Sequence, residues 1–72
     1  MIKTGAALRA ELVAIARASA ASGGPLPTRE RLAELAGATL RQIDRQIEQL
    51  LAAGTIKTER RNRRTWVRAV KE

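Results

Sequence analysis

Three stretches of the chain place aliphatic side chains three or four positions apart, which is the spacing of one face of a helix. The first stretch begins after Thr4 and runs to about Ala21, and the glycines and proline of residues 22–25 end it. We expect a long helix rich in alanine, with inward positions at Leu8, Leu12, Ile15, Ala16 and Ser19.

Two shorter helical stretches follow, and Gly37 separates them. Thr28 is a suitable N-cap for the first of the two, and Gly37 is placed to end it in a left-handed turn. Thr39 and Gln42 form a Thr-x-x-Gln capping box for the next helix, which Gly54 closes. The predicted inward residues of the two helices are Leu32, Leu35 and Ala36, then Ile43, Ile47, Leu50 and Leu51, with Leu40 at the edge.

Residues 55–60 and 64–70 are predicted to form the two strands of a β-hairpin, because Thr, Ile, Val and Trp favour strands. Asn62 suits a turn position with positive φ. Ile56 is expected to face the core, and the strand register decides whether Trp66 or Val67 joins it. We expect Trp66 in the core, where it would anchor the hairpin, whereas an exposed Trp66 would indicate a protein interface.

Leu26 precedes a proline, which pushes it into an extended conformation. We expect it to be buried, at a place where a short third strand could pair with the hairpin. The order of elements then predicts a single α+β domain over residues 1–72. Its predicted architecture is a winged helix-turn-helix, with three helices followed by a two-stranded β-wing.

The formal net charge is +7, and most of the excess lies late in the chain. Residues 1–56 hold seven basic and five acidic side chains, whereas residues 57–72 hold seven basic and two acidic ones. Such a localised excess attracts polyanions. The alternative is a tail that only aids solubility, but these arginines alternate with strand-forming residues. The predicted wing residues are Arg60, Arg61, Asn62, Arg63 and Arg64.

The chain contains no cysteine and no histidine, which excludes disulfides, the usual zinc sites and thiol or imidazole catalysis. We therefore expect no enzyme activity, no metal and no cofactor. No signal peptide or membrane-spanning stretch is visible, because charged residues interrupt the longest apolar run. The absence of cysteine fits a reducing compartment, so the expected location is the cytoplasm, in association with the nucleoid.

The third predicted helix carries polar side chains on its outward face. A helix fits into the major groove of DNA, and side chains near its start reach the base edges, where arginine can pair with guanine and glutamine with adenine. The predicted base-reading residues are Arg41, Gln42 and Arg45. The alternative is a solvent-facing surface, with Arg45 paired to Asp44 or Glu48. Asp44 could instead accept from cytosine, or hold one of the arginines in position.

Contacts with the DNA backbone are predicted at helix starts, where backbone N–H groups favour a phosphate. Thr28 and Arg29 open the second helix, and Thr39 could bind a phosphate or serve only as an N-cap. Lys3 and Arg9 give a weaker signal of the same kind. The arginines around Asn62 suit a narrow minor groove or the phosphates beside it, whereas a solvated loop tip is the alternative.

Residues 26–56 resemble the N-terminal DNA-binding domain of the GntR family of bacterial transcription regulators. The run of residues 64–67, Arg-Thr-Trp-Val, is also similar to the run that ends the wing in that family. The resemblance implies a winged helix-turn-helix that binds DNA. The shared positions are Leu26, Pro27, Leu32, Ala33, Glu34, Gly37, Leu50, Gly54 and Ile56.

The chain departs from the family pattern in three ways. Leu40 stands where the family has an arginine, and Arg41 could replace that contact one position later. Asn62 and Arg64 stand in place of wing glycines, with one extra residue, which predicts a longer and more basic wing. The family also carries a C-terminal effector domain for which this chain has no visible room. We expect either a stand-alone regulator, from a bacterium, a phage or a mobile element, or a fragment of a larger protein.

Together these features predict a sequence-specific regulator of transcription that binds double-stranded DNA, most simply a small stand-alone repressor. One copy reads only a few base pairs, so a homodimer on an inverted repeat is expected, with the alanine-rich first helix as its contact. Two alternatives are a non-specific or replication-associated DNA-binding protein and a winged-helix module that binds protein or RNA. Stacking on RNA bases is disfavoured, because Trp66 is the sole aromatic residue.

Overall fold

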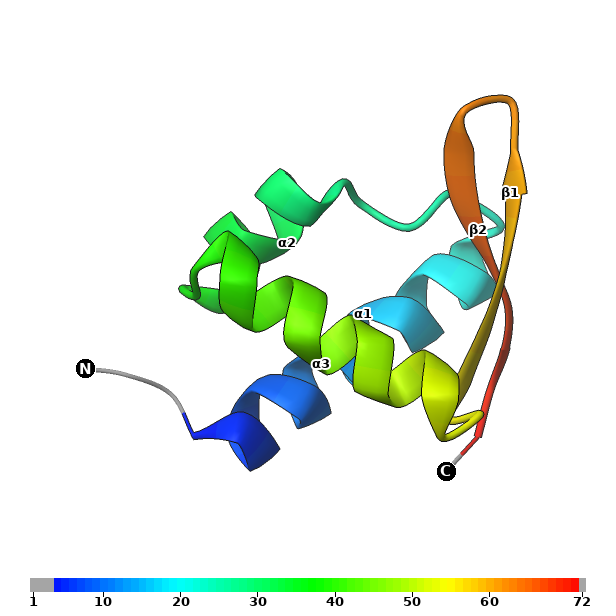
Figure 1. The fold of residues 1–72 in the computed structure, drawn as a ribbon. Coiled ribbons are helices and arrows are strands. Elements are labelled where there is room, and N and C mark those ends of the chain that lie inside the picture. Colours follow the sequence, from blue (N-terminus) through cyan, green and yellow to red (C-terminus); the bar gives the residue numbers. More distant parts are fainter. Residues whose placement is uncertain (1–3, 72) are drawn as a thin grey trace.

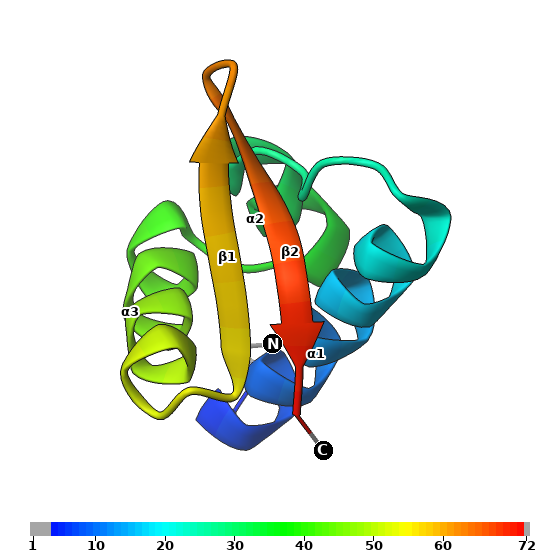
Figure 2. The ribbon, with the colours of Figure 1, turned by 90° about the vertical axis from the view of Figure 1, so that its right-hand side faces the viewer.

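A computed structural model describes residues 4–71 of the chain. Three helices come first, α1 (Gly5–Ser22), α2 (Arg29–Ala36) and α3 (Leu40–Ala52), and two strands follow, β1 (Ile56–Arg61) and β2 (Arg64–Val70). The strands pair antiparallel, so the α+β class is confirmed. The hairpin stands beside the helices with its tip projecting past them (Figure 1), and it lies across α1 and α3 (Figure 2).

A threonine precedes each helix and caps it. The Oγ1 atoms of Thr4, Thr28 and Thr39 each accept a hydrogen bond from the backbone N–H three residues later, at 3.1–3.2 Å. Gln42 completes the predicted capping box, because its Oε1 accepts from the backbone N–H of Thr39 at 2.9 Å. Gly37 ends α2 with a φ of 64°, a conformation that costs glycine little. These local signals explain why the predicted helix bounds hold.

The core is aliphatic and draws on all three helices and β1. It consists of Leu8, Leu12, Ala16, Leu32, Ala36, Ile43, Leu50 and Ile56. Two leucines that were predicted to face inward do not, since Leu35 is 50% and Leu51 42% exposed. The reason on α3 is that its buried stripe runs through Ile43, Gln46 and Leu50, which turns Leu51 onto a flank of the helix.

The hairpin contains a β-bulge that decides which of its side chains reach the core. Lys57 pairs with Ala69 but Thr58 pairs with Val67, so Arg68 is an extra residue in β2. Regular alternation would place Val67 and Val70 on opposite faces, whereas both pack against the core here. Because of the bulge, two valines three positions apart both anchor the hairpin to the core.

The prediction that Trp66 lies in the core is wrong. Trp66 pairs with Glu59 in the ladder and points to the face opposite Val67, where it is half-buried. Its Nε1–H donates to the backbone oxygen of Arg61 at 3.3 Å, and the Arg61 guanidinium lies 5.1 Å from the ring centroid. The tryptophan thus stiffens the hairpin from outside by a hydrogen bond and a cation–π contact.

The predicted third strand is reduced to one hydrogen bond. The backbone N–H of Leu26 donates to the oxygen of Thr65 at 2.8 Å, and within residues 4–71 the sheet has two strands. Leu26 is half-buried against the core, which is less than predicted. This bond still ties the segment before α2 to β2, and it helps to hold the start of α2 beside the hairpin.

Removal of the Thr39 cap tests the contribution of the capping box to stability. Thr39→Ala should lower the free energy of unfolding by about 1 kcal/mol, and the midpoint of thermal unfolding by about 4–8 °C. Thr39→Ser keeps the hydroxyl group and is the matched control. Circular dichroism during heating measures both variants, and equal midpoints for them would show that the cap contributes nothing.

Candidate nucleic-acid interface

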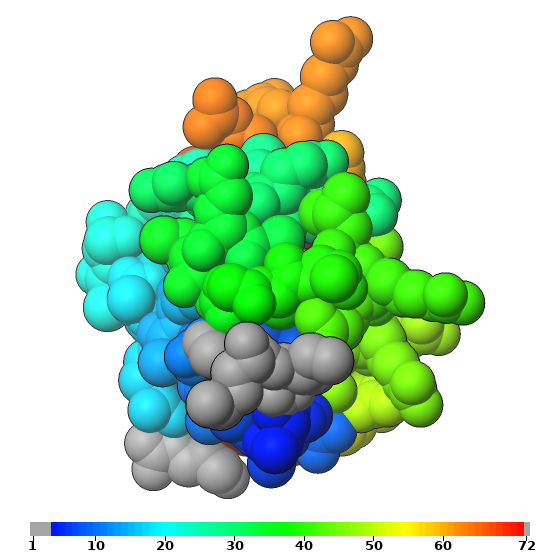
Figure 3. Space-filling view, turned by 90° about the vertical axis from the view of Figure 1, so that its left-hand side faces the viewer, coloured from blue at the N-terminus to red at the C-terminus, as the bar shows by residue number. Residues whose placement is uncertain are grey.

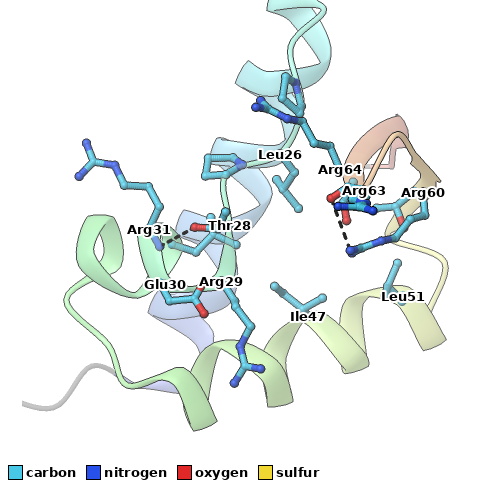
Figure 4. Close-up of a pocket in the computed structure, with 15 residues that line it drawn as sticks. Leu26, Thr28, Arg29, Glu30, Arg31, Ile47, Leu51, Arg60, Arg63 and Arg64 are labelled. Atoms are coloured by element: carbon cyan, nitrogen blue, oxygen red, sulfur yellow. Dashed lines mark hydrogen bonds between the residues drawn. The ribbon is translucent and has the colours of Figure 1, made fainter.

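An open groove of about 840 Å³ separates the start of α2 and one flank of α3 from the hairpin. Its floor is apolar and includes Leu26, Ile47 and Leu51. In Figure 4, Arg60 of the hairpin lies across the groove from Ile47 and Leu51. The predicted site residues that line this groove are Thr28, Arg29, Arg60, Arg63 and Arg64.

Arg29 forms an ion pair across the helix-turn-helix segment. Its Nη2 lies 2.6 Å from Oδ2 of Asp44 on α3, and both side chains are about half exposed. The interpretation that Asp44 holds Arg41 or Arg45 is therefore wrong, because Asp44 is bound to Arg29 instead. The pair compensates the acidic charge on this flank of α3 and fixes the guanidinium of Arg29 beside the groove.

Arg41 and Arg45 lie exposed on the outward face of α3. Within residues 4–71 neither guanidinium forms a hydrogen bond or an ion pair, and the alternative pairing of Arg45 with Glu48 is not formed. Both side chains therefore keep all their donors for a ligand. Of the three predicted base-reading residues, these two are exposed and without a partner in residues 4–71.

Gln42 and Thr39 are engaged with each other at the start of α3. The Oε1 of Gln42 accepts from the N–H of Thr39, and the Thr39 hydroxyl lies 3.3 Å from the same oxygen. Recognition of adenine uses both the oxygen and the nitrogen of the amide, so it would compete with the capping box. Gln42 is also half-buried beside α1 and α3 residues, in a separate polar hollow that Arg9 and Arg45 line.

The hairpin tip, residues 60–64, turns through two residues with positive φ, Asn62 at 53° and Arg63 at 64°. This is the pattern of a type I′ turn, in which the second position favours glycine. The positive φ of Asn62 was predicted, but that of Arg63 was not. A left-handed conformation costs an arginine about 1 kcal/mol. Such strain, where an arginine stands at an exposed position that favours glycine, motivates a functional hypothesis for this side chain.

The four arginines of the tip separate onto two faces. Arg60, Arg63 and Arg64 line the groove, and Nη2 of Arg60 lies 3.4 Å from the backbone oxygen of Arg63. Arg61 instead covers Trp66 on the opposite face. In Figure 3 the tip projects beyond the surface that α2 and the start of α3 form. Three of the four tip arginines therefore lie on the same side of the molecule as α2 and α3.

Arg9 has a structural role that the sequence did not indicate. Its Nε donates to Oε1 of Gln46 at 3.2 Å, and its Nη2 donates to Oε1 of Gln49 at 2.6 Å. These bonds join α1 to α3, and the first satisfies the amide oxygen of Gln46, which is 8% exposed. They connect residues 37 and 40 positions apart in the sequence, so no local pattern could reveal them. Lys3 lies outside the described residues.

Comparison of the chain with models of known protein families, with curated proteins and with solved structures finds no match. No helix of residues 4–71 is long and apolar enough to cross a membrane. In the same residues, no three acidic side chains are close enough together to share a metal ion. The groove, the outward face of α3 and the hairpin tip are therefore the features of the structure that bear on function.

The strain at the tip can be tested by replacing Arg63 with the residue that its backbone favours. Arg63→Gly should raise the free energy of unfolding by about 1 kcal/mol, and the midpoint of thermal unfolding by roughly 4–8 °C. Arg64→Gly removes the same charge at a regular strand position, and it should lower stability by about 0.5–1 kcal/mol. A lower midpoint for Arg63→Gly would show that the turn carries no strain.

Proposed function

We propose that this chain is a winged helix-turn-helix domain that binds double-stranded DNA sequence-specifically and regulates transcription, most simply as a repressor that occludes a promoter. In this proposal α3 enters the major groove, and the hairpin is the wing that contacts the minor groove or the backbone. The element order is compatible with a winged-helix layout. The resemblance of residues 26–56 to the DNA-binding domain of GntR regulators supports the same assignment.

The observation that carries the proposal is the placement of three arginines of the hairpin along one groove. Arg60, Arg63 and Arg64 line it, and Arg29, held in its ion pair, lies across from them at the start of α2. The acidic side chain that also lines the groove is Glu30, in the first turn of α2. A groove with this charge and an open shape fits a phosphodiester strand better than a small neutral ligand.

The outward face of α3 supplies the base contacts in this proposal. Arg41 and Arg45 lie one turn apart near the start of the helix and keep their donors, so each can make two hydrogen bonds to guanine O6 and N7. A good bidentate pair contributes about 1–3 kcal/mol of discrimination. Phosphates held by the groove fix the register in which these side chains meet the bases.

A homodimer on an inverted repeat remains part of the proposal, because one domain reads only a few base pairs. The outward side of α1 offers a contact of the predicted kind. Exposed small residues recur along it at helical spacing, at Ala10, Ala14, Ala18 and Ala21. A monomer that stays monomeric on its preferred duplex at micromolar concentration would contradict this part of the proposal.

Non-specific DNA binding is the second candidate, and one observation favours it. The Oε1 of Gln42 is occupied by the capping box, which leaves two arginines as base-reading residues against five that line the groove. Phosphate contacts carry no sequence information by themselves. Under this alternative the groove would hold any duplex, and α3 would add little preference.

Substitutions on α3 and on the hairpin should separate these two functions. Arg41→Ala or Arg45→Ala should lower the preference for the selected duplex over a random one by about tenfold or more. Arg60→Ala, Arg63→Ala and Arg64→Ala should weaken binding to both duplexes alike, and each should reduce the log–log salt slope by about one. Fluorescence anisotropy at several salt concentrations measures both quantities. Equal losses on the two duplexes for the α3 variants would favour the non-specific clamp.

The effect on DNA affinity of where a charge lies can be measured separately from the effect of the net charge. Asp44→Asn removes an acidic group from the flank of α3 beside the groove, and should tighten DNA binding about fivefold at low salt. Glu59→Gln is the matched control, because it removes the same charge from an exposed pair with Arg68, and neither residue lines the groove. It should change the affinity less than twofold. Equal gains in the two variants would show that net charge, and not this face, determines binding.

A further inference from the structure

Three large apolar side chains are exposed in residues 4–71, namely Leu35, Leu40 and Leu51. A single exposed leucine is ordinary on a protein surface. Leu40 is informative because of its position, since it is the first residue of α3 and directly precedes Arg41. It is 39% exposed and takes no part in the core or in the apolar layer packed against the core.

Leu40 begins an apolar line along α3. Leu40, Ile47 and Leu51 are spaced by seven and four residues, which places them on one side of the helix, and we call this side the apolar flank. Ile47 and Leu51 form part of the groove floor, so the flank faces the hairpin. Asp44 lies on the same side, but its carboxylate is held by Arg29 at 2.6 Å.

The outward face and the apolar flank are therefore two adjacent sides of α3 that differ in their chemistry. Arg41 and Arg45 present hydrogen-bond donors, whereas the flank presents methyl groups. The first residues of a recognition helix are those that reach base edges in the major groove. Among the four bases, thymine alone displays a methyl group there, and apolar side chains are the ones that contact it.

We infer that Leu40 reads the C5-methyl group of a thymine next to the base that Arg41 contacts. The inference rests on the proposed function, and it adds a base preference that the charged residues do not supply. Ile47 and Leu51 continue the same apolar surface toward the sugar–phosphate strand in the groove. The preferred duplex then contains a thymine beside the guanine that Arg41 recognises.

Replacement of thymine by deoxyuridine tests the inference, because it removes one methyl group and leaves base pairing intact. A preferred duplex is first selected with the unchanged protein from a randomised pool, and each thymine is then replaced in turn. At one or two of these thymines, replacement by deoxyuridine should weaken binding about fourfold. This factor corresponds to the free energy of burying one methyl group. Leu40→Ala should bind the two duplexes with equal affinity.

Leu35→Ala is the matched control, because Leu35 is also an exposed leucine but lies on α2. This variant should keep the fourfold preference for thymine. Far-ultraviolet circular dichroism establishes that both variants are folded. Loss of the preference in Leu40→Ala alone would support the inference, and loss in both variants would overturn it.

The remaining outcomes separate this inference from the proposed function. If selection enriches a motif but deoxyuridine is tolerated at every position, the inference is wrong and sequence-specific binding stands. If duplexes bind without enrichment, both are wrong. If Leu40→Ala changes the sedimentation behaviour of the protein and leaves the thymine preference unchanged, the apolar flank is a protein interface and the inference is overturned.

Discussion

The packing of the base of the hairpin against an aliphatic core determines where the basic side chains of this protein lie. Ile56 is buried among the helices, and the bulge at Arg68 lets both Val67 and Val70 pack against the same core. Beyond these anchors the two strands run on without support from the core, so the tip projects past the helices. A shift of one residue in this register would turn the valines outward and move the arginines of the groove to the opposite face.

Polar contacts on the surface divide the charged residues into structural and available groups. Arg9 joins α1 to α3, Arg29 joins α2 to α3, and Arg61 covers the tryptophan ring. Arg41 and Arg45 have no such partner in residues 4–71, and they lie on the outward face of the helix next to the groove. Unpaired arginines on one side of a small domain support the proposed binding of a polyanion.

Local signals in the sequence predicted the local structure well. The capping threonines, Gly37 and the positive φ at Asn62 each act within a few residues, and the structure confirms them. The errors concern contacts between distant segments. Trp66 was expected in the core because a bulge cannot be read from the residue types of a strand. The pair of Asp44 with Arg29 was not among the roles expected for Asp44, because it depends on how α2 crosses α3. The base-reading role of Arg41 stays a prediction.

An amide NMR titration with a short duplex selected from a random pool tests the central claim, that α3 and the hairpin tip contact one duplex together. The account predicts that shifts on binding cluster at the start of α2, on the outward face of α3 and at residues 60–64, with further shifts along the alanine face of α1 where two copies meet on one duplex. Shifts confined to the hairpin tip would contradict the account, because α3 would then have no part in recognition.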